Sequence, residues 1–240
     1  MENKTLNLKA AKPFASGGNR LCFVHPDDPA RCIKVRRPDF SLKKLRSRKR
    51  FPKNLKPLSS FDDNLEEFRV MTQIERRLGE EAFELISRCY GFENSDLGKG
   101  LTSELIRDEA GTISHTLKQY LWDNGYTEDC QRAVAAFGQR WVEICIPSRD
   151  LILHNVVVQR DVDGTIQRLV VIDGLGNPNI LPFWWQPKAI QRKKAERKVQ
   201  NFKQRIDDLL AQRTDGPLPG YHGQLFHDGT DQTAASGAPK

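Results

Sequence analysis

Apolar residues recur along the first part of the chain with two different periods. Residues 6–35 carry short apolar runs broken by turn residues at 17–18 and 26–29, which predicts a meander of strands. Over residues 65–78 the apolar positions step by three or four, which predicts a helix. Residues 84–92 and 101–106 are typical of two further strands. The pattern predicts a five-stranded sheet with one helix after its third strand.

The second part of the chain is mostly helical in pattern. We expect a short helix over 113–122, a strongly amphipathic one over 128–146 and a basic one over 186–211. Apolar runs at 156–158 and 169–172 flank a polar turn, which predicts a β-hairpin. From residue 213 onward no periodicity remains, so residues 213–240 are expected to be a disordered tail.

Polar residues stand at the ends of the predicted hairpin. Asp150 precedes Asn155 by five positions, and Asp173 directly follows the second apolar run. Phosphoryl transfer from ATP uses one carboxylate for the nucleophile's proton, with an amide oxygen and a second carboxylate for Mg²⁺. The spacing therefore favours Asp150 as the catalytic acid/base and Asn155 with Asp173 as metal ligands. Each residue alone would more often be an ordinary surface group.

The first part of the chain supplies the remaining groups of such a site. Lys34 lies between Ile33 and Val35, as in a strand that carries a phosphate-binding cation. Gly17 and Gly18 precede it, where a flexible loop over the phosphates is expected.

An acid and a linker complete the expected site. Glu67 of the predicted helix is the best partner for Lys34, with Glu66 as the alternative. The backbone of Glu104 and Ile106 is expected to bind the adenine. Because these groups occur in kinase order, we expect an α+β, protein-kinase-like bilobal fold, with an N-lobe over 1–106, a small helical C-lobe over 107–212 and the tail over 213–240.

Several stretches resemble the YrbL family of PhoP regulatory network proteins. They are His25-Pro-Asp-Asp28, Arg31-Cys-Ile-Lys34, Glu75-Arg-Arg-Leu78, Arg88-Cys-Tyr-Gly91, Asn155-Val-Val157, Asp173-Gly-Leu-Gly176 and Ile180-Leu-Pro182. The resemblance covers roughly residues 10–212 and implies a small bacterial protein of kinase-like fold. It places Lys34, Glu67, Asn155 and Asp173 in a nucleotide site, and it implies nucleotide binding more firmly than catalysis.

Positive charge is concentrated in one segment that follows the strand of Lys34. The net charge is +7, and ten lysines and arginines fall within residues 36–56. Residues 36–63 are therefore expected to be an exposed basic insert, either a solvated loop or, over 36–57, a surface for an anionic partner. The five cysteines are scattered, as is typical of reduced thiols. No signal pattern or membrane-length apolar run is present, so we expect a cytoplasmic protein.

Three functions fit these features. The first is an ATP- and Mg²⁺-dependent phosphotransferase acting on an acceptor such as a small molecule, sugar or lipid headgroup. A peptide acceptor is disfavoured, because only about a dozen residues separate Asp173 from the last helix and A-P-E is absent. The alternatives are a regulatory nucleotide-binding pseudokinase and a basic protein that binds nucleic acid or a membrane surface. Nucleic acid is disfavoured because no aromatic residues interleave the basic runs.

Overall fold

The structure is a computed structural model that describes residues 5–47, 50–51, 53–55, 57–176, 183–220 and 222–229. The chain separates into two compact units. The first consists of the described residues of Met1–Gln73 and Arg88–Leu105, and the second of those of Ile74–Ser87 and Ile106–Lys240. The predicted lobe boundaries stay predictions.

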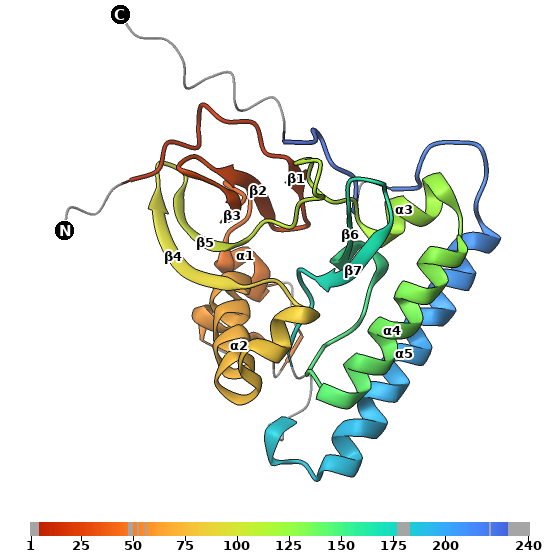
Figure 1. Ribbon diagram of the computed structural model, residues 1–240. Coiled ribbons are helices and arrows are strands. Elements are labelled where there is room, and N and C mark those ends of the chain that lie inside the picture. The colour runs from red at the N-terminus through yellow and green to blue at the C-terminus, as the bar shows by residue number, and fades with distance from the viewer. Residues whose placement is uncertain are drawn as a thin grey trace, which may run out of the picture. The chain divides into compact units, whose positions relative to one another are not determined.

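The first unit is built on one antiparallel sheet of five strands, in the order β1-β2-β3-β5-β4 (Figure 1). The strands are β1 (Ala15–Ser16), β2 (Arg20–His25), β3 (Asp28–Arg36), β4 (Cys89–Ser95) and β5 (Gly98–Glu104). The predicted five-stranded sheet is confirmed. Strand β3 pairs with strands on both sides, and residues 32–35 of it are all buried. Lys34 is therefore one polar residue within a run of core positions.

Helix α2 (Asp63–Leu78) follows the sheet's third strand, as the periodicity predicts. The Asp62 Oδ1 atom accepts hydrogen bonds from the amide groups of Asn64 and Leu65, at 3.1 and 3.3 Å. This side chain satisfies amide groups that the first helical turn leaves without partners. The ring of Phe68 packs against Phe92 of β4, with 5.3 Å between centroids. Contacts on both sides of Glu67 in the sequence thus fix the start of the helix.

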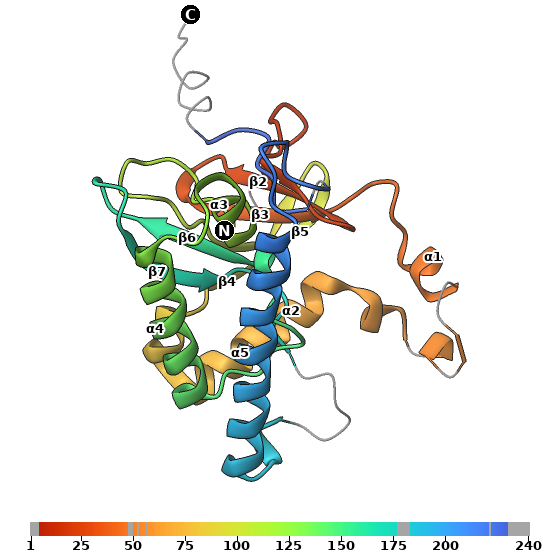
Figure 2. The ribbon, with the colours of Figure 1, turned by 90° about the vertical axis from the view of Figure 1, so that its right-hand side faces the viewer.

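The described residues of the basic insert form short helical pieces between β3 and α2 (Figure 2). These pieces are α1 (Leu42–Ser47) and the 3-10 turns η1 (Lys53–Leu55) and η2 (Leu58–Phe61). Phe51 and Leu55 are exposed. The exposure expected of this insert is therefore present in the described residues, although short helices replace a structureless loop.

The described residues of the second unit form the last part of α2, three further helices, a hairpin and three 3-10 turns. Its elements are η3 (Gly79–Glu84), α3 (Leu117–Asn124), α4 (Glu128–Ile144), η4 (Leu153–Asn155), β6 (Val156–Arg160), β7 (Ile166–Val171), η5 (Phe183–Trp185) and α5 (Lys188–Ala211). Helices α4 and α5 lie side by side (Figures 1 and 2). A Cβ atom at Gly138 would lie 2.8 Å from Val199 Cγ1, so this glycine permits the close approach of the two helices. Among the described residues, no helix has the length and apolar character needed to cross a membrane.

Several helix ends differ from the predicted ones, and two of these differences have a clear local cause. Helix α4 ends at Ile144 rather than residue 146, because Cys145 adopts a left-handed conformation with φ of 58°. Pro147 lacks an amide hydrogen and cannot extend the helix. Helix α3 begins at Leu117 rather than 113, because the Thr116 hydroxyl accepts the amide hydrogen of Gln119 and caps the helix.

Described residues from 213 onward make contacts that the sequence pattern did not indicate, while the disordered tail over 213–240 stays a prediction. The N-cap residue of α3 and two residues within this helix donate hydrogen bonds to backbone carbonyls of the segment that follows α5. The contacts are Trp122 Nε1 to Gly216 O (2.7 Å), Lys118 Nζ to Pro219 O (2.5 Å) and Thr116 Oγ1 to Gly223 O (2.8 Å). These contacts are made to backbone carbonyls, so no hydrophobic period in the sequence marks them. Residues 221 and 230–240 of the predicted tail lie outside the described residues.

Candidate functional site

Lys34 and Glu67 form a buried ion pair within the first unit. The Lys34 Nζ atom lies 2.6 Å from Glu67 Oε1, and the two side chains are 7% and 10% exposed. Strand β3 positions the lysine, and the first turns of α2 position the glutamate. The structure thus pairs Lys34 with Glu67, the first of the two acids that the sequence offered as its partner. A buried ammonium group needs such a partner, because burial of an unpaired charge costs several kcal/mol.

Two further side chains join this pair and were not foreseen from the sequence. Arg20 of β2 forms an ion pair with Glu67 Oε2. Its guanidinium also donates to Asn64 Oδ1 at 3.1 Å, and Asn64 Nδ2 donates to the Lys34 carbonyl at 2.8 Å. One carboxylate therefore serves two cations, which suits a nearby anionic ligand. Arg20 had no sequence signal beyond its place after the paired glycines.

Two buried thiols, Cys32 in the first unit and Cys130 in the second, are not candidates for nucleophilic chemistry. All five cysteines are free, as expected. Burial raises the pKa of Cys32 to about 12, although the neighbouring Lys34 lowers it in part. Burial likewise raises the pKa of Cys130 to about 12. Neither thiolate forms near neutral pH, and the thiolate is the reactive species.

Gly17 and Gly18 form the turn between β1 and β2, where the Gly17 amide donates to the Arg20 carbonyl at 2.9 Å. Neither glycine has a positive φ. A Cβ atom at Gly18 would meet nothing within 4 Å, and one at Gly17 would meet only the Arg20 carbonyl at 3.9 Å. The fold itself therefore does not require glycine at either position. Their expected role over phosphates stays a prediction.

Glu104 and Ile106 both make structural contacts. Glu104 ends β5, and its Oε2 atom accepts the Arg88 amide hydrogen at 3.0 Å. Ile106 is buried against Val157 and Val170, and its carbonyl accepts the Ser114 amide hydrogen at 3.1 Å. The expected adenine contacts of their backbone groups stay predictions.

The structure brings Asp150, Asn155 and Asp173 together within the second unit. Val156 pairs with Val171 in the β6–β7 hairpin, and the Ile172 amide donates to the Asn155 carbonyl at 2.9 Å. Asn155 and Asp173 therefore stand at the same end of the hairpin. Asp173 Oδ1 also accepts the amide hydrogen of the following glycine at 2.7 Å.

Gly174 makes this close arrangement possible. Its φ is +82°, and a Cβ atom there would lie 2.8 Å from Asn155 Nδ2 and 3.1 Å from the Asp150 carbonyl oxygen. The Arg149 amide donates to the Gly174 carbonyl at 2.9 Å. The loop that carries Asp150 is thus attached to the segment that directly follows Asp173.

The carboxylate of Asp150 is engaged by two cations of α5. Arg205 donates to both carboxylate oxygens, at 2.6 and 3.3 Å, and Lys198 Nζ lies 3.6 Å from Oδ1. The sequence pattern placed both cations in the basic helix expected over 186–211. Their spacing of two helical turns puts them on one face, but nothing in the sequence links that face to Asp150.

The acids of the second unit suit a nucleotide-bound metal better than a metal held by protein alone. The described part of the chain contains no group of three or more histidine, cysteine, aspartate or glutamate side chains placed to bind one ion. Asp173 and Asn155 offer one carboxylate and one amide oxygen. Mg²⁺ often takes one or two protein oxygens together with phosphate oxygens, so this donor set fits Mg²⁺ that arrives with a nucleotide.

The chain is similar to one protein family and to a solved structure. A family model described as PhoP regulatory network protein YrbL matches residues 6–207. The YrbL proteins of Escherichia coli (strain K12) and Shigella flexneri are each 24% identical over 207 residues, covering 82% of this chain and 86% of theirs. The crystal structure of Rad53 1-466 in complex with AMP-PNP is similar with a TM-score of 0.42 and 14% identity. That match covers 87% of this chain and 48% of the Rad53 chain.

Proposed function

Because this chain belongs to the YrbL family of PhoP regulatory network proteins, we propose that it binds MgATP and transfers the terminal phosphoryl group to a small non-peptide acceptor. The observation that carries the proposal is the buried ion pair of Lys34 and Glu67, at 2.6 Å. In kinase-like proteins such a pair holds the lysine amine against the ATP phosphates. The order of strand, helix, Asp150 loop and hairpin supports the same assignment.

Each remaining residue has a separate part in the proposal. Asn155 and Asp173 hold Mg²⁺, which neutralises the charge that develops on the transferred phosphate. Asp150 accepts or orients the proton of the acceptor hydroxyl. Gly17 and Gly18 allow backbone amide groups to approach the phosphates.

Adenine recognition falls to the last residue of β5 and the segment that follows it in this proposal. The backbone of Glu104 and Ile106 hydrogen-bonds the adenine edge. The side chain of Glu104 already binds the Arg88 amide at 3.0 Å, so the side chain fixes the segment while its backbone meets the base.

The acceptor in this proposal is not a peptide. Protein kinases use the stretch after the strand-end aspartate to bind a peptide, whereas here only the 14 residues 174–187 separate Asp173 from α5, and A-P-E is absent. A compact acceptor such as a small molecule, a sugar or a lipid headgroup needs no such platform.

A second candidate function is favoured by the surroundings of Asp150. Its carboxylate is already bound by Arg205 and Lys198, which compete with an acceptor hydroxyl for the same oxygens. A regulatory protein that binds MgATP without transferring phosphate would keep this arrangement. The two functions share the nucleotide site and differ in whether Asp150 matters for turnover.

Thermal unfolding with and without MgATP tests nucleotide binding. A ligand present at about 100 times its dissociation constant stabilises the native state by about 2.7 kcal/mol. Saturating MgATP should therefore raise the melting temperature by several degrees. Lys34→Met should remove this rise, because it removes the cation that meets the phosphates.

Two controls accompany that experiment. Lys203→Met makes the same chemical change at an exposed position of α5 and should keep the full rise. Lys34→Arg keeps the positive charge and should keep part of it. A wild-type melting temperature that does not respond to saturating MgATP would overturn the proposed function.

A further inference from the structure

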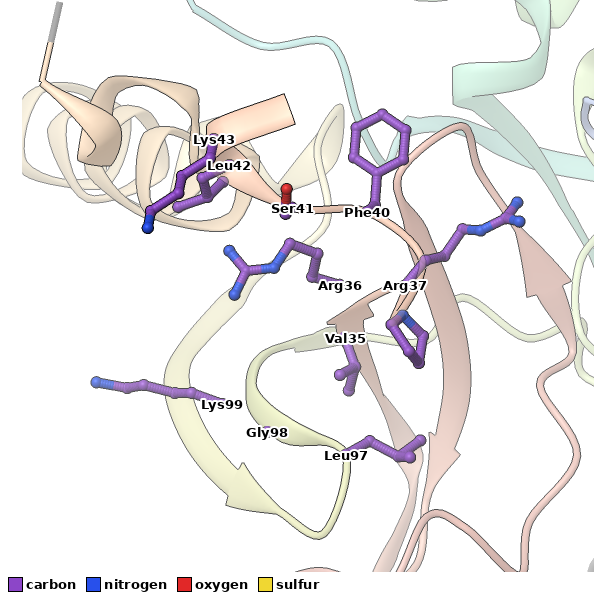
Figure 3. A pocket seen from close by; sticks show the side chains of 11 residues that line it. Val35, Arg36, Arg37, Phe40, Ser41, Leu42, Lys43, Leu97, Gly98 and Lys99 are labelled. Carbon is purple, nitrogen blue, oxygen red and sulfur yellow. The ribbon is translucent and has the colours of Figure 1, made fainter. Parts of the chain in front are cut away.

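A cavity of about 490 Å³ opens in the first unit beside the end of β3 (Figure 3). It is lined by the last residues of β3, the first residues of the basic insert and the turn between β4 and β5. The lining residues used below are Val35, Arg36, Leu42, Lys43, Leu97 and Lys99. Cavities that hold organic ligands typically measure about 300–1,000 Å³, so this one is large enough for a small metabolite.

The cavity has a cationic side. Arg36, Lys43 and Lys99 extend toward the same side of the view, whereas Arg37 points away from them (Figure 3). Arg37 is also paired with Asp39 at 3.0 Å. The three cations come from three different segments, so the chain fold and not local sequence gathers them.

The positive charge of this side is poorly compensated. Arg36 lies 4.0 Å from its carboxylate partner Asp62, at the outer limit of an ion pair. Lys99 Nζ lies 4.8 Å from the centroid of the Phe92 ring. Within the described ranges, neither Lys43 nor Lys99 has a carboxylate within 4.0 Å. Three neighbouring cations repel one another, and a bound anion relieves that repulsion.

Hydrogen bonds hold one wall of the cavity in place before any ligand arrives. In the β4–β5 turn, Ser95 Oγ donates to the Gly98 carbonyl at 2.6 Å, and Asp96 Oδ1 accepts the Leu8 amide hydrogen at 2.8 Å. These bonds fix the turn that carries Lys99. A ligand therefore loses little free energy to ordering this wall.

The opposite wall is fixed in the same way. The Arg37 amide donates to the Asn19 carbonyl at 2.9 Å, and the Phe40 amide donates to the Arg37 carbonyl at 3.0 Å. The side chains of Val35, Leu42 and Leu97 add an apolar part to the lining. Cations beside an apolar surface suit an organic molecule that carries phosphate, more than a bare inorganic anion.

We propose that this cavity binds a small soluble molecule that carries two or more phosphate groups. Several phosphates match several cations from separate segments, and the apolar lining accommodates the organic part. The proposal does not rest on the proposed function, because the cavity is not lined by Lys34, Glu67, Asn155 or Asp173.

Calorimetric titration of the full chain tests the proposal. The probes are inorganic tripolyphosphate and fructose 1,6-bisphosphate, and the protein carries Lys34→Met so that the proposed nucleotide site is disabled. We expect one-to-one binding of both probes that weakens as salt concentration rises. Binding in this variant separates the cavity from any MgATP site.

Charge-removing variants then locate the binding site. Lys43→Gln and Lys99→Gln should each weaken binding by about two- to fivefold, the range that one exposed ion pair typically contributes, and the double variant by about the product of the two factors. All these side chains are exposed, so the variants are expected to fold. Lys203→Gln removes the same charge from α5 and should leave the affinity unchanged.

Three outcomes would overturn the proposal. One is the absence of binding by either probe, and another is a loss of affinity in Lys203→Gln equal to that in the cavity variants. The third is binding of a lipid headgroup at these lysines in place of a soluble ligand. Vesicles that contain phosphatidylinositol bisphosphate, if bound at Lys43 and Lys99 without competition from tripolyphosphate, would show a membrane contact in place of a cavity ligand.

Discussion

Asp150 and Asp173 are both acids, but different groups hold their carboxylates. Asp150 is bound by the cations of Arg205 and Lys198. Asp173 accepts a backbone amide hydrogen and stands beside Asn155 at the hairpin end. Substitution of each acid by its amide keeps the shape and removes the charge, so the two roles in the proposed function separate experimentally.

For Asp173 the prediction concerns metal dependence. Asp173→Asn should weaken binding of MgATP more than binding of metal-free ATP, because an amide oxygen is a poorer Mg²⁺ ligand than a carboxylate. Titration of ATP with and without Mg²⁺ measures the two affinities. An equal loss in both titrations would assign Asp173 a structural role.

For Asp150 the prediction concerns turnover. Asp150→Asn should lower the rate of phosphoryl transfer or of slow ATP hydrolysis by roughly 10²–10⁴-fold, the range of positioned proton transfer, with MgATP affinity nearly unchanged. Steady-state assays across candidate acceptors measure this. Equal turnover in the variant and the wild type would favour the regulatory function, because only the transferase needs this carboxylate.

At the scale of elements, a single glycine permits the hairpin end and the Asp150 loop to meet. Gly174→Ala should destabilise the protein through a left-handed φ and through contact with Asn155 and the Asp150 carbonyl. Gly164, in the β6–β7 turn, has a nearly equal φ of +83°, and a Cβ atom there would meet nothing within 4 Å. Gly164→Ala therefore isolates the conformational cost, about 1 kcal/mol.

Chemical denaturation of both variants measures the difference. Gly174→Ala should lose more stability than Gly164→Ala, and only Gly174→Ala should weaken Mg²⁺-dependent ATP binding. Equal losses of stability in the two variants would mean that the segment can move away from Asn155 at no cost.

The packing of the segment after α5 predicts a pH dependence. His154 stacks on His222, with ring centroids 5.3 Å apart. Burial, then the neighbouring His222 and Lys118, lower the pKa of His154 below its ordinary value of 6.5. The unfolded chain therefore binds a proton more readily than the folded one. Stability should be fully present above about pH 6.5 and should fall as pH drops from there toward the lowered pKa.

Melting temperatures across this pH window test the prediction. Burial also lowers the pKa of His115, so the wild type has two contributions of the same sign. His154→Gln should reduce the loss of stability on acidification without abolishing it. A variant whose melting temperature falls as steeply as that of the wild type would exclude His154 as a source of the effect.

At the scale of the whole molecule, local pattern predicted some features and could not predict others. The sheet, α2 and the Lys34–Glu67 pair were predictable, because the spacing of apolar residues and the order of the motifs are both visible in the sequence itself. The contact of Arg205 with Asp150 joins residues 55 positions apart, and no local pattern specifies it. Residues 213–220 and 222–229 make polar contacts to α3, and such contacts leave no hydrophobic period in the sequence.

The polar contacts at the start of α2 have a thermodynamic consequence. Asp62 faces Arg36 at 4.0 Å and also binds the Asn64 amide at 3.1 Å, while the Asn64 side chain holds the Lys34 carbonyl at 2.8 Å. An anion that draws Arg36 away from Asp62 changes the ion pair between these two side chains. A ligand at Lys34 acts on the hydrogen bond between the Asn64 side chain and the Lys34 carbonyl. Linkage requires that any change in affinity be reciprocal. If occupancy at Arg36 alters affinity at Lys34, then occupancy at Lys34 alters affinity at Arg36 by the same factor.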